Sequence, residues 1–454
     1  MGLMSPKTGA TFEAVKRRSG WRSAPRLLTT CVFFAVLWVW LNLTSSAILI
    51  PTDSFEYLKD EGLKEILNTT LGFEKIFVLN LPSRTDRRDA ITLSSAVSNI
   101  KLEFVEGVTG ASIHDKAYPP PEANKKLLSG IRGSWRTHMN ALQRVVEQNL
   151  TTALIFEDDV DWDLRVRQNL QRFALASRFL SSSSKQYTST LQSKLEHHTN
   201  TETPATAIQI IDTSTLPKTL HSLPLSSLPS VTKPTRSPYG DPTNWDILWL
   251  GHCGAGMPRP PPHPPSTPAT DLSLLTLPND ATVPSARHLK AHPFQSDPDA
   301  LATTFPPHTR IYHAATGGTL CTVAYAVSQR GARRLLHQFA MQGWSAIFDA
   351  ELGRWCAGYD PDLGRQSTPS KTAAAGGGRD AHGKERVCLT TQPPIFSHHH
   401  PRGGQSDIGG LGGGYATKYE TKYLRYSVRM NLEKLVWGRE GEVVDQWPDE
   451  EDGV

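Results

Sequence analysis

Three adjacent acidic residues, Glu157, Asp158 and Asp159, directly follow the short apolar run 153–156. Like charges packed together raise each other's energy unless a cation or solvent compensates. Mn²⁺ and Mg²⁺ prefer carboxylate and phosphate oxygens, so one such ion could bridge this trio and a diphosphate. The ion would act as a Lewis acid on a departing nucleoside diphosphate. We expect Asp159 to bind the metal directly, with Asp158 as a second metal ligand and Glu157 and Asp158 also contacting the donor; a solvated acidic turn is the alternative.

The elements around the trio predict an α/β domain. Residues 75–81 and 102–108 have the composition of short strands, residues 134–149 show apolar residues at helical spacing, and residues 153–156 form another strand. A strand, helix, strand succession is typical of an α/β fold. In an open α/β sheet the carboxyl ends of the strands border the ligand crevice. The trio should therefore face a crevice, with Glu157 and Asp159 on one side of the chain and Asp158 on the other.

Long polar stretches interrupt this domain, which we expect to span residues 72–454. Residues 181–240 and 255–308 are rich in Ser, Thr and Pro, and residues 360–385 contain an AAAGGG run. Their composition predicts disordered, low-complexity insertions. Between these insertions, residues 245–251 are predicted to form a strand and residues 328–339 a helix. Residues 320–327, and residues 388–396 after the last insertion, are predicted to be ordered.

Other residues could act beside the trio. Arg84 and Arg87 follow the first predicted strand, where guanidinium groups could bind phosphate, although a solvated turn with ordinary ion pairs is as plausible. His138 lies on or beside the apolar face of the predicted helix, as either a core histidine or a donor contact. One of the three consecutive histidines His398, His399 and His400 could supply a metal or phosphate contact, or the run could belong to a flexible surface tract.

Asp349 is the candidate catalytic base. It follows the apolar pair Ile347 and Phe348, and a partly desolvated carboxylate there could take a proton from an acceptor hydroxyl. The alternative is that it caps the N-terminus of a helix beginning at Ala350.

The N-terminal region predicts membrane attachment. Residues 1–26 hold six basic residues and one acid and so carry +5, which leaves about −1 for the remainder of a chain whose net charge is +4. Residues 27–50 contain no charged residue and are long enough to span a bilayer. We expect a cytoplasmic tail (1–26), a transmembrane signal-anchor (27–50), a stem (51–71) and a lumenal body; a cleaved signal peptide is the alternative. The body has no excess positive charge, so a nucleic-acid partner gains no support.

Four cysteines lie in the expected lumenal body: Cys253, Cys321, Cys356 and Cys388. Disulfides are permitted in the secretory pathway. Three pairings are possible, and the sequence does not choose among them.

Four blocks of residues follow one another along the chain: residues 76–81 with Arg84, Asp86, Arg87 and Arg88; residues 133–138; residues 154–160; and residues 318–336 followed by Asp349. These blocks, in this order, resemble glycosyltransferase family 25, which includes bacterial lipooligosaccharide galactosyltransferases and procollagen galactosyltransferases. Ser134 and Thr137 stand where the family often has Cys and Ser.

The resemblance implies a GT-A-like, Rossmann-type fold that binds a UDP-sugar, most often UDP-galactose, with Mn²⁺ (or Mg²⁺) and inversion at the anomeric carbon. The acceptor would be a glycan or glycoprotein, and the enzyme would reside in the Golgi or endoplasmic reticulum membrane. A catalytically inactive relative that serves as a lumenal binding or adhesion protein is the alternative. The implied donor-binding residues are Asn80, Arg84, Arg87, His138, Glu157 and Asp158.

Overall fold

The structure is a computed structural model. It describes residues 60–183, 209–212, 219–228, 236–259, 274–290, 298–358, 386–401, 406–408 and 420–449. The expected tail (1–26), signal-anchor (27–50) and first part of the stem lie outside the described residues, as does the expected insertion at 360–385. Within the described ranges, none of the helices has the length and apolar character needed to cross a membrane.

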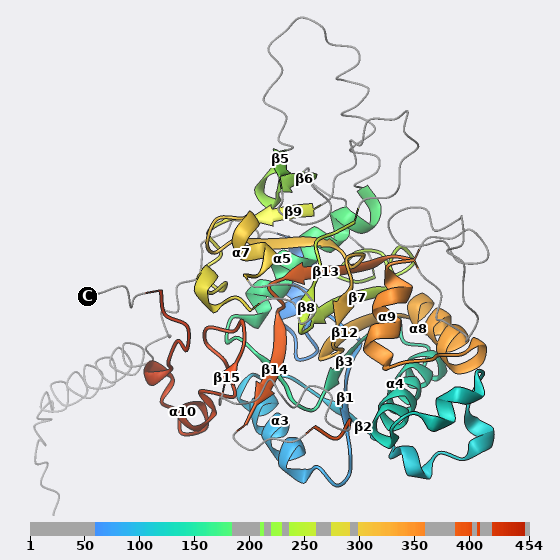
Figure 1. The fold of residues 1–454 in the computed structure, drawn as a ribbon. Coiled ribbons are helices and arrows are strands. Elements are labelled where there is room, and N and C mark those ends of the chain that lie inside the picture. Colours follow the sequence, from blue (N-terminus) through green and yellow to red (C-terminus); the bar gives the residue numbers. More distant parts are fainter. Residues whose placement is uncertain are drawn as a thin grey trace, which may run out of the picture. The chain divides into compact units, whose positions relative to one another are not determined.

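A single large mixed sheet forms the centre of the described region (Figure 1). Strand β14 (Phe396–His400) pairs with β4 (Val160–Trp162), β7 (Ile247–Gly251) and β15 (Glu420–Thr421) beside the main path. Strand β8 (Gly254–Ala255) pairs with β11 (Thr319–Leu320) in a separate ribbon. The main path runs β2 (Glu103–Glu106), β1 (Lys75–Asn80), β3 (Thr152–Glu157), β12 (Ala324–Ser328), β7 (Ile247–Gly251), β13 (Cys388–Gln392), β10 (Arg310–Ala314), β9 (Leu274–Leu277), β6 (Thr219–Pro224) and β5 (Gln209–Asp212).

The N-terminal strands have the parallel arrangement that is typical of an α/β fold. Strand β1 pairs in parallel with both β2 and β3, as expected for buried strands linked by helical crossovers. Strand β12 then joins β3 in antiparallel orientation and continues the sheet to β7. The α/β class predicted from the sequence is confirmed, and this end of the sheet fits a Rossmann-like fold.

Alternate residues of the central strands fill two apolar cores. In β1, Ile76 and Val78 belong to one core, whereas Phe77 and Leu79 belong to the other. Side chains of a strand alternate between faces, so a strand that is apolar at every position must be covered on both sides. The first core includes residues of α2 (Glu61–Lys64), α3 (Thr85–Val97) and α5 (Val166–Arg178); the second includes residues of α4 (Ser129–Glu147), α8 (Gln329–Leu336) and α9 (Phe348–Cys356).

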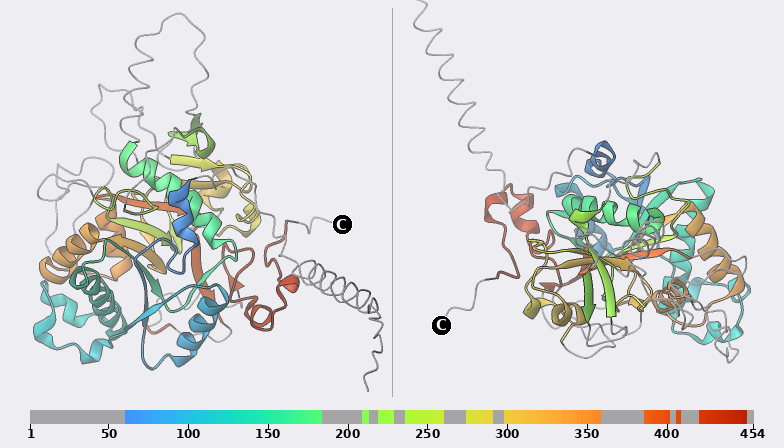
Figure 2. Two further views of the ribbon diagram at one scale, coloured as in Figure 1. Left: turned by 180° about the vertical axis from the view of Figure 1, so that it is seen from behind. Right: turned by 90° about the horizontal axis from the view of Figure 1, so that it is seen from above.

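The figures show this layering. Seen from behind, α2 and α5 lie together in front of the sheet (Figure 2). Helices α4, α8 and α9 gather on the other side (Figure 1). Helices therefore cover both faces of the sheet. A binding site can form at the edge where β1 and β3 end.

Two predicted helices have different bounds in the structure. Helix α4 begins at Ser129, five residues before the predicted start at 134, and buries Trp135, Met139 and Leu142 as expected. Helix α8 begins after Ser328, whose hydroxyl accepts a hydrogen bond from the N–H of Gly331. It ends at Leu336, and a π-helical turn (His337–Gln342) follows, so the apolar spacing predicted the helix but not its change of pitch.

The expected stem requires a correction at residues 60–71. Leu63, Ile66 and Leu71 are buried in the first core, and Asp60 forms an ion pair with Arg178 of α5. Three buried apolar side chains tie this segment to the sheet domain. The folded domain therefore includes residue 60, rather than beginning at residue 72 as we expected.

Two of the expected insertions also require correction. The stretch 181–240 contains β5 and β6, and the stretch 255–308 contains β9 and the short helix α7 (Ala300–Thr304). Leu220, Leu223, Leu274 and Leu275 are fully buried. These leucines lie among Pro and Ser residues, so the composition did not predict strands there. The strands form because they pair with neighbouring strands that are distant in the sequence.

Candidate functional site

A cavity of about 690 Å³ opens where β1 and β3 end. The chain turns away from the sheet at Asn80 and at Glu157, so the polar residues that follow both strands meet at one edge. Of the candidate site residues predicted from the sequence, the cavity wall contains Asn80, Arg87, His138, Glu157, Asp158, Asp159, Asp349, His398, His399 and His400. Arg84 is not part of the wall.

Asp158 faces the end of β1. Its carboxylate accepts hydrogen bonds from Asn80 Nδ2 at 2.9 Å and from Arg87 Nη1 at 2.7 Å. Burial raises the pKa of Asp158 and the neighbouring charge of Asp159 adds to this increase, while Arg87 opposes it. Asp158, which we expected to be a second metal ligand, is thus engaged by the protein and lies outside the group of potential ligands described next.

Glu157, Asp159 and His398 form that group. One ligand atom from each lies within 4.8 Å of the others, and His398 Nε2 is 3.7 Å from Glu157 Oε2 and from Asp159 Oδ1. Glu157 and Asp159 lie on the same side of the chain, as the alternation of an extended segment predicts. Two carboxylates and one imidazole are a donor set that suits a divalent transition metal.

Buried oxygen atoms in the site have no hydrogen-bond partner among the described residues. They are Asp159 Oδ1 and Asn80 Oδ1. A buried polar atom left unpaired is costly, so its retention needs an explanation such as an ion or a ligand. The Asp159 atom faces His398 within the potential ligand group, and the Asn80 atom belongs to a residue of the cavity wall. The residues present therefore fit a cation at Asp159 and a hydrogen-bond donor at Asn80.

The charges of this group are mutually reinforcing. Burial alone would raise the pKa of Glu157 and of Asp159, but His138 and His398 beside Glu157, and His398 and Arg87 beside Asp159, bring both pKa values below the ordinary range. Burial would lower the pKa of His398, but the charges of Asp159 and Glu157 raise it. Both carboxylates are thus anionic at neutral pH, while a proton on His398 competes with any metal ion.

His138 lies behind Glu157. It is buried, its Nδ1 is 3.0 Å from the Tyr325 hydroxyl, and its ring stacks on Phe348. Its Nε2 is 3.6 Å from Glu157 Oε1. His138 is therefore both a core histidine and a neighbour of the ligand group. Its side chain packs in the interior and also lies beside Glu157.

Asp349 lies in the first turn of α9 and does not cap it, because the N-cap position is Ile347. Its Oδ2 accepts from the Cys321 N–H at 2.7 Å and its Oδ1 from the Ala350 N–H at 2.7 Å. Burial raises its pKa, which these two hydrogen bonds oppose. A carboxylate on the cavity wall with a raised pKa has the properties of a general base.

Arg84 and Arg87 have different environments. Arg87 Nη1 contacts Asp158, and also lies 3.1 Å from Asp159 Oδ2. Arg84 instead forms ion pairs with Asp86 and with Asp407, and Asp407 itself lines the cavity. Of the two arginines, only Arg87 therefore lies on the cavity wall.

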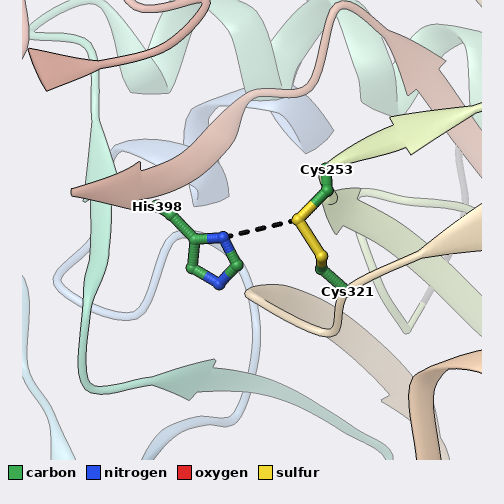
Figure 3. A group of neighbouring side chains, drawn as sticks. All are labelled: Cys253, Cys321 and His398. Carbon is green, nitrogen blue, oxygen red and sulfur yellow. Dashed lines mark hydrogen bonds between the residues drawn. A yellow bond between two sulfur atoms is a disulfide. The ribbon is translucent and has the colours of Figure 1, made fainter. Parts of the chain in front are cut away.

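Among the described residues, Cys253 is bonded to Cys321 and Cys356 to Cys388 in two disulfides. The first borders the cavity, and Cys253 Sγ is 3.5 Å from His398 Nδ1 (Figure 3). Cys253, Cys321 and His398 also meet the distance criterion for a metal group. Because the sulfurs of Cys253 and Cys321 are bonded to each other, the two cysteines offer no thiolate ligand.

The sequence did not single out two neighbours of the trio. Thr322 donates a hydrogen bond from Oγ1 to Glu157 Oε1 at 2.6 Å, and Arg429 donates from Nη2 to the Asp158 carbonyl at 2.7 Å. Thr322 follows a cysteine within a block that resembles the family, which was a usable indication. Arg429 lies in the C-terminal segment, where no pattern pointed to the site.

Residues 73–222 match the model of glycosyltransferase family 25 (LPS biosynthesis protein). The resemblance to family 25 is thereby confirmed. Strands β1 and β3, Asn80, Arg87 and the acidic trio lie within the matched residues, whereas Asp349 and His398 lie beyond them.

Three named relatives each match between 22% and 28% of this chain. Procollagen galactosyltransferase 2 of Mus musculus is 26% identical over 113 residues, which are 22% of this chain and 18% of the relative. Inactive glycosyltransferase 25 family member 3 of Homo sapiens is 29% identical over 113 residues, 22% of this chain and 19% of the relative. Procollagen galactosyltransferase 1-B of Xenopus laevis is 24% identical over 151 residues, 28% of this chain and 25% of the relative. The chain thus spans a quarter or less of each of these relatives, which include both named enzymes and a protein named as inactive.

Proposed function

We propose that this protein is a membrane-anchored, metal-dependent glycosyltransferase. It transfers a hexose, which we expect to be galactose, from a UDP-sugar to a hydroxyl group of a glycan or glycoprotein. The observation that carries the proposal is the meeting of Glu157, Asp159 and His398 on the wall of a large cavity, inside the fold of a family 25 domain. A binding protein without catalysis has no need of such a group.

The donor set favours Mn²⁺ over Mg²⁺. Mg²⁺ is usually bound through carboxylates, phosphates and water, whereas imidazole suits transition metals. Glu157, Asp159 and His398 would hold the ion, which when bound would neutralise charge on the departing diphosphate. Arg87 lies on the cavity wall beside Asp158 and Asp159, so its guanidinium group would be close to a diphosphate bound at the metal and would bind it as well.

The remaining residues would position the reactants. Asn80 presents an unpaired amide oxygen that could accept a hydrogen bond from a donor hydroxyl group. Asp349 would take the proton of the acceptor hydroxyl as that oxygen bonds to the anomeric carbon and the bond to UDP breaks. Direct displacement of this kind inverts the anomeric centre.

Localisation in the Golgi or endoplasmic reticulum membrane is part of the proposal. The uncharged stretch 27–50 with basic residues before it supports a type II anchor. The two disulfides support a lumenal position for the domain, since disulfides persist in oxidising compartments.

The test compares the full-length chain with Asp159→Ala and with Glu103→Gln as a matched control. Glu103 is a carboxylate on β2 that pairs with Lys75 and does not line the cavity. A thermal-shift panel of UDP-sugars with Mn²⁺ should raise the melting temperature of the parent and control proteins. The same two proteins should hydrolyse UDP-galactose at least tenfold faster than Asp159→Ala.

Equal hydrolysis by all three proteins would reject the metal site. A flat thermal-shift panel together with no hydrolysis by the parent protein would favour the alternative, a lumenal binding protein like the relative named as inactive.

A further inference from the structure

The Cys253–Cys321 disulfide occupies a special position in the site. It lines the cavity and lies between two strands that are already paired, because β7 ends two residues before Cys253 and β12 begins three residues after Cys321. The ribbon of β8 and β11 pairs the same two chain segments on the other side of the bridge. Backbone hydrogen bonds on both sides of the bridge therefore already hold these two chain segments together. This leaves the positions of nearby side chains as what the disulfide can fix.

The bridge contacts His398 directly. Cys253 Sγ is 3.5 Å from His398 Nδ1, on the opposite side of the ring from Nε2, which faces Glu157 and Asp159 (Figure 3). A histidine that binds a metal through one nitrogen is normally oriented by a partner at the other. The sulfur atom occupies that partner position here.

The other half of the bridge holds Asp349 and Glu157. Cys321 has a φ of 65°, in the left-handed region that residues with a Cβ seldom adopt. In this conformation its N–H donates to Asp349 Oδ2 at 2.7 Å, and the next residue, Thr322, donates to Glu157 Oε1 at 2.6 Å. The carbonyl of Cys321 accepts from Trp249 Nε1, so the turn is fixed from several sides.

We propose that the Cys253–Cys321 disulfide is a positioning element of the active site. It fixes the imidazole of His398 against the metal group and holds the strained turn whose N–H orients Asp349. The inference rests on the proposed function, and it adds that metal binding and turnover depend on the oxidised state of this bridge. Removing a residue that orients a metal ligand typically weakens metal binding about 10- to 100-fold.

The test uses two double variants of the full chain, C253A/C321A and C356A/C388A. The second removes the bridge between the far end of α9 and β13, which does not line the cavity. Both variants should melt at lower temperature because each loses a cross-link. Mn²⁺ binding, followed by titration calorimetry and by the electron paramagnetic resonance spectrum of the ion, should weaken at least tenfold in C253A/C321A only. The kcat for UDP-galactose hydrolysis should fall with it.

The outcomes separate the inference from the function. If the parent protein binds no Mn²⁺ and hydrolyses no donor, the proposed function fails. If the parent is active and C253A/C321A matches it in Mn²⁺ affinity and kcat, or if both double variants lose affinity equally, the positioning role is wrong.

If C253A/C321A does not fold, a second measurement on the parent protein tests the same inference. The parent protein is partly reduced in graded thiol buffers, and its free cysteines are alkylated and assigned by mass spectrometry. Loss of Mn²⁺ binding should follow the opening of Cys253–Cys321. Loss that follows only Cys356–Cys388 would overturn the inference.

Discussion

His398 Nε2 lies 3.7 Å from Asp159 Oδ1, although one residue belongs to the C-terminal part of the domain and the other to its first half. Strand β14 pairs with β4 in antiparallel orientation, and His398 is opposite Val160, the residue after Asp159. The backbone pairing of two short strands therefore completes the ligand group.

Replacing His398 should weaken metal binding. In His398→Asn the imidazole ligand is lost, and we expect the Mn²⁺ affinity to fall at least tenfold, measured by titration calorimetry without donor. His400 is the matched control because it lies on the same face of β14 but outside the ligand group. Its replacement by Asn should leave the Mn²⁺ affinity within about threefold. Equal losses in the two variants would assign the effect to the strand rather than to His398.

The folding stability of the metal-free protein should depend on pH because of His398. The fold raises the pKa of this histidine, so its protonation stabilises the folded state fully below the ordinary pKa, and this contribution is lost as the pH rises through the higher folded value. Mn²⁺ competes with the same proton, so its affinity should increase over the same interval, which lies above the ordinary histidine pKa of 6.5. Urea unfolding with Mn²⁺ and with a chelator checks both trends. Identical pH profiles for the parent and His398→Asn would contradict the assignment.

Asp349 should control the rate of transfer. In Asp349→Asn the base is lost, and we expect the kcat to fall about 10²- to 10⁴-fold while Mn²⁺ affinity changes little. Burial raises the pKa of this carboxyl, so the acid limb of the pH–rate profile should lie above the ordinary value of 3.8, with activity increasing as the group deprotonates. A kcat within threefold of the parent would remove Asp349 from the mechanism.

Arg87 and its neighbour Arg88 provide a matched pair. Arg87 faces Asp158 and Asp159 on the cavity wall, whereas Arg88 stacks on Phe104 outside it. Arg87→Ala should raise the KM for the UDP-sugar about 10- to 100-fold, because a charged hydrogen bond to phosphate contributes about 1.5–3 kcal/mol. Arg88→Ala should leave the KM near the parent value. The prediction fails if the two variants behave alike in steady-state kinetics.

The corrected domain boundary can be tested by truncation. A fragment beginning at Phe73 lacks Leu63, Ile66 and Leu71, which are buried and contribute roughly 1.5–3 kcal/mol each. It should unfold at a clearly lower urea concentration than a fragment beginning at Asp60, if it folds at all. Coincident unfolding curves for the two fragments would restore the boundary at residue 72.

Local patterns in the sequence determined the first half of the sheet and the acidic trio. Residues 75–81 and 153–156 are short apolar runs followed by polar residues, and such runs form buried parallel strands whose ends share an edge. That reasoning predicted that Arg87 and the acidic trio border one crevice, and both line the same cavity, whereas Asn80 was implied only by the resemblance to family 25. The strands hidden in the Pro-rich stretches could not be predicted in the same way, because β6 and β9 depend on partners distant in the chain.

Only the tertiary structure decided which acid faces which partner. Spacing along the chain cannot tell that Asp158 is engaged by Asn80 and Arg87 while Asp159 keeps an unpaired oxygen beside His398. Nor can it choose among three disulfide pairings, because a bridge requires two cysteines to lie close in space. The sequence by itself determined the residue types and the strand that presents them, since these follow from local periodicity; the ligand group and the disulfide beside it arise from long-range strand pairing.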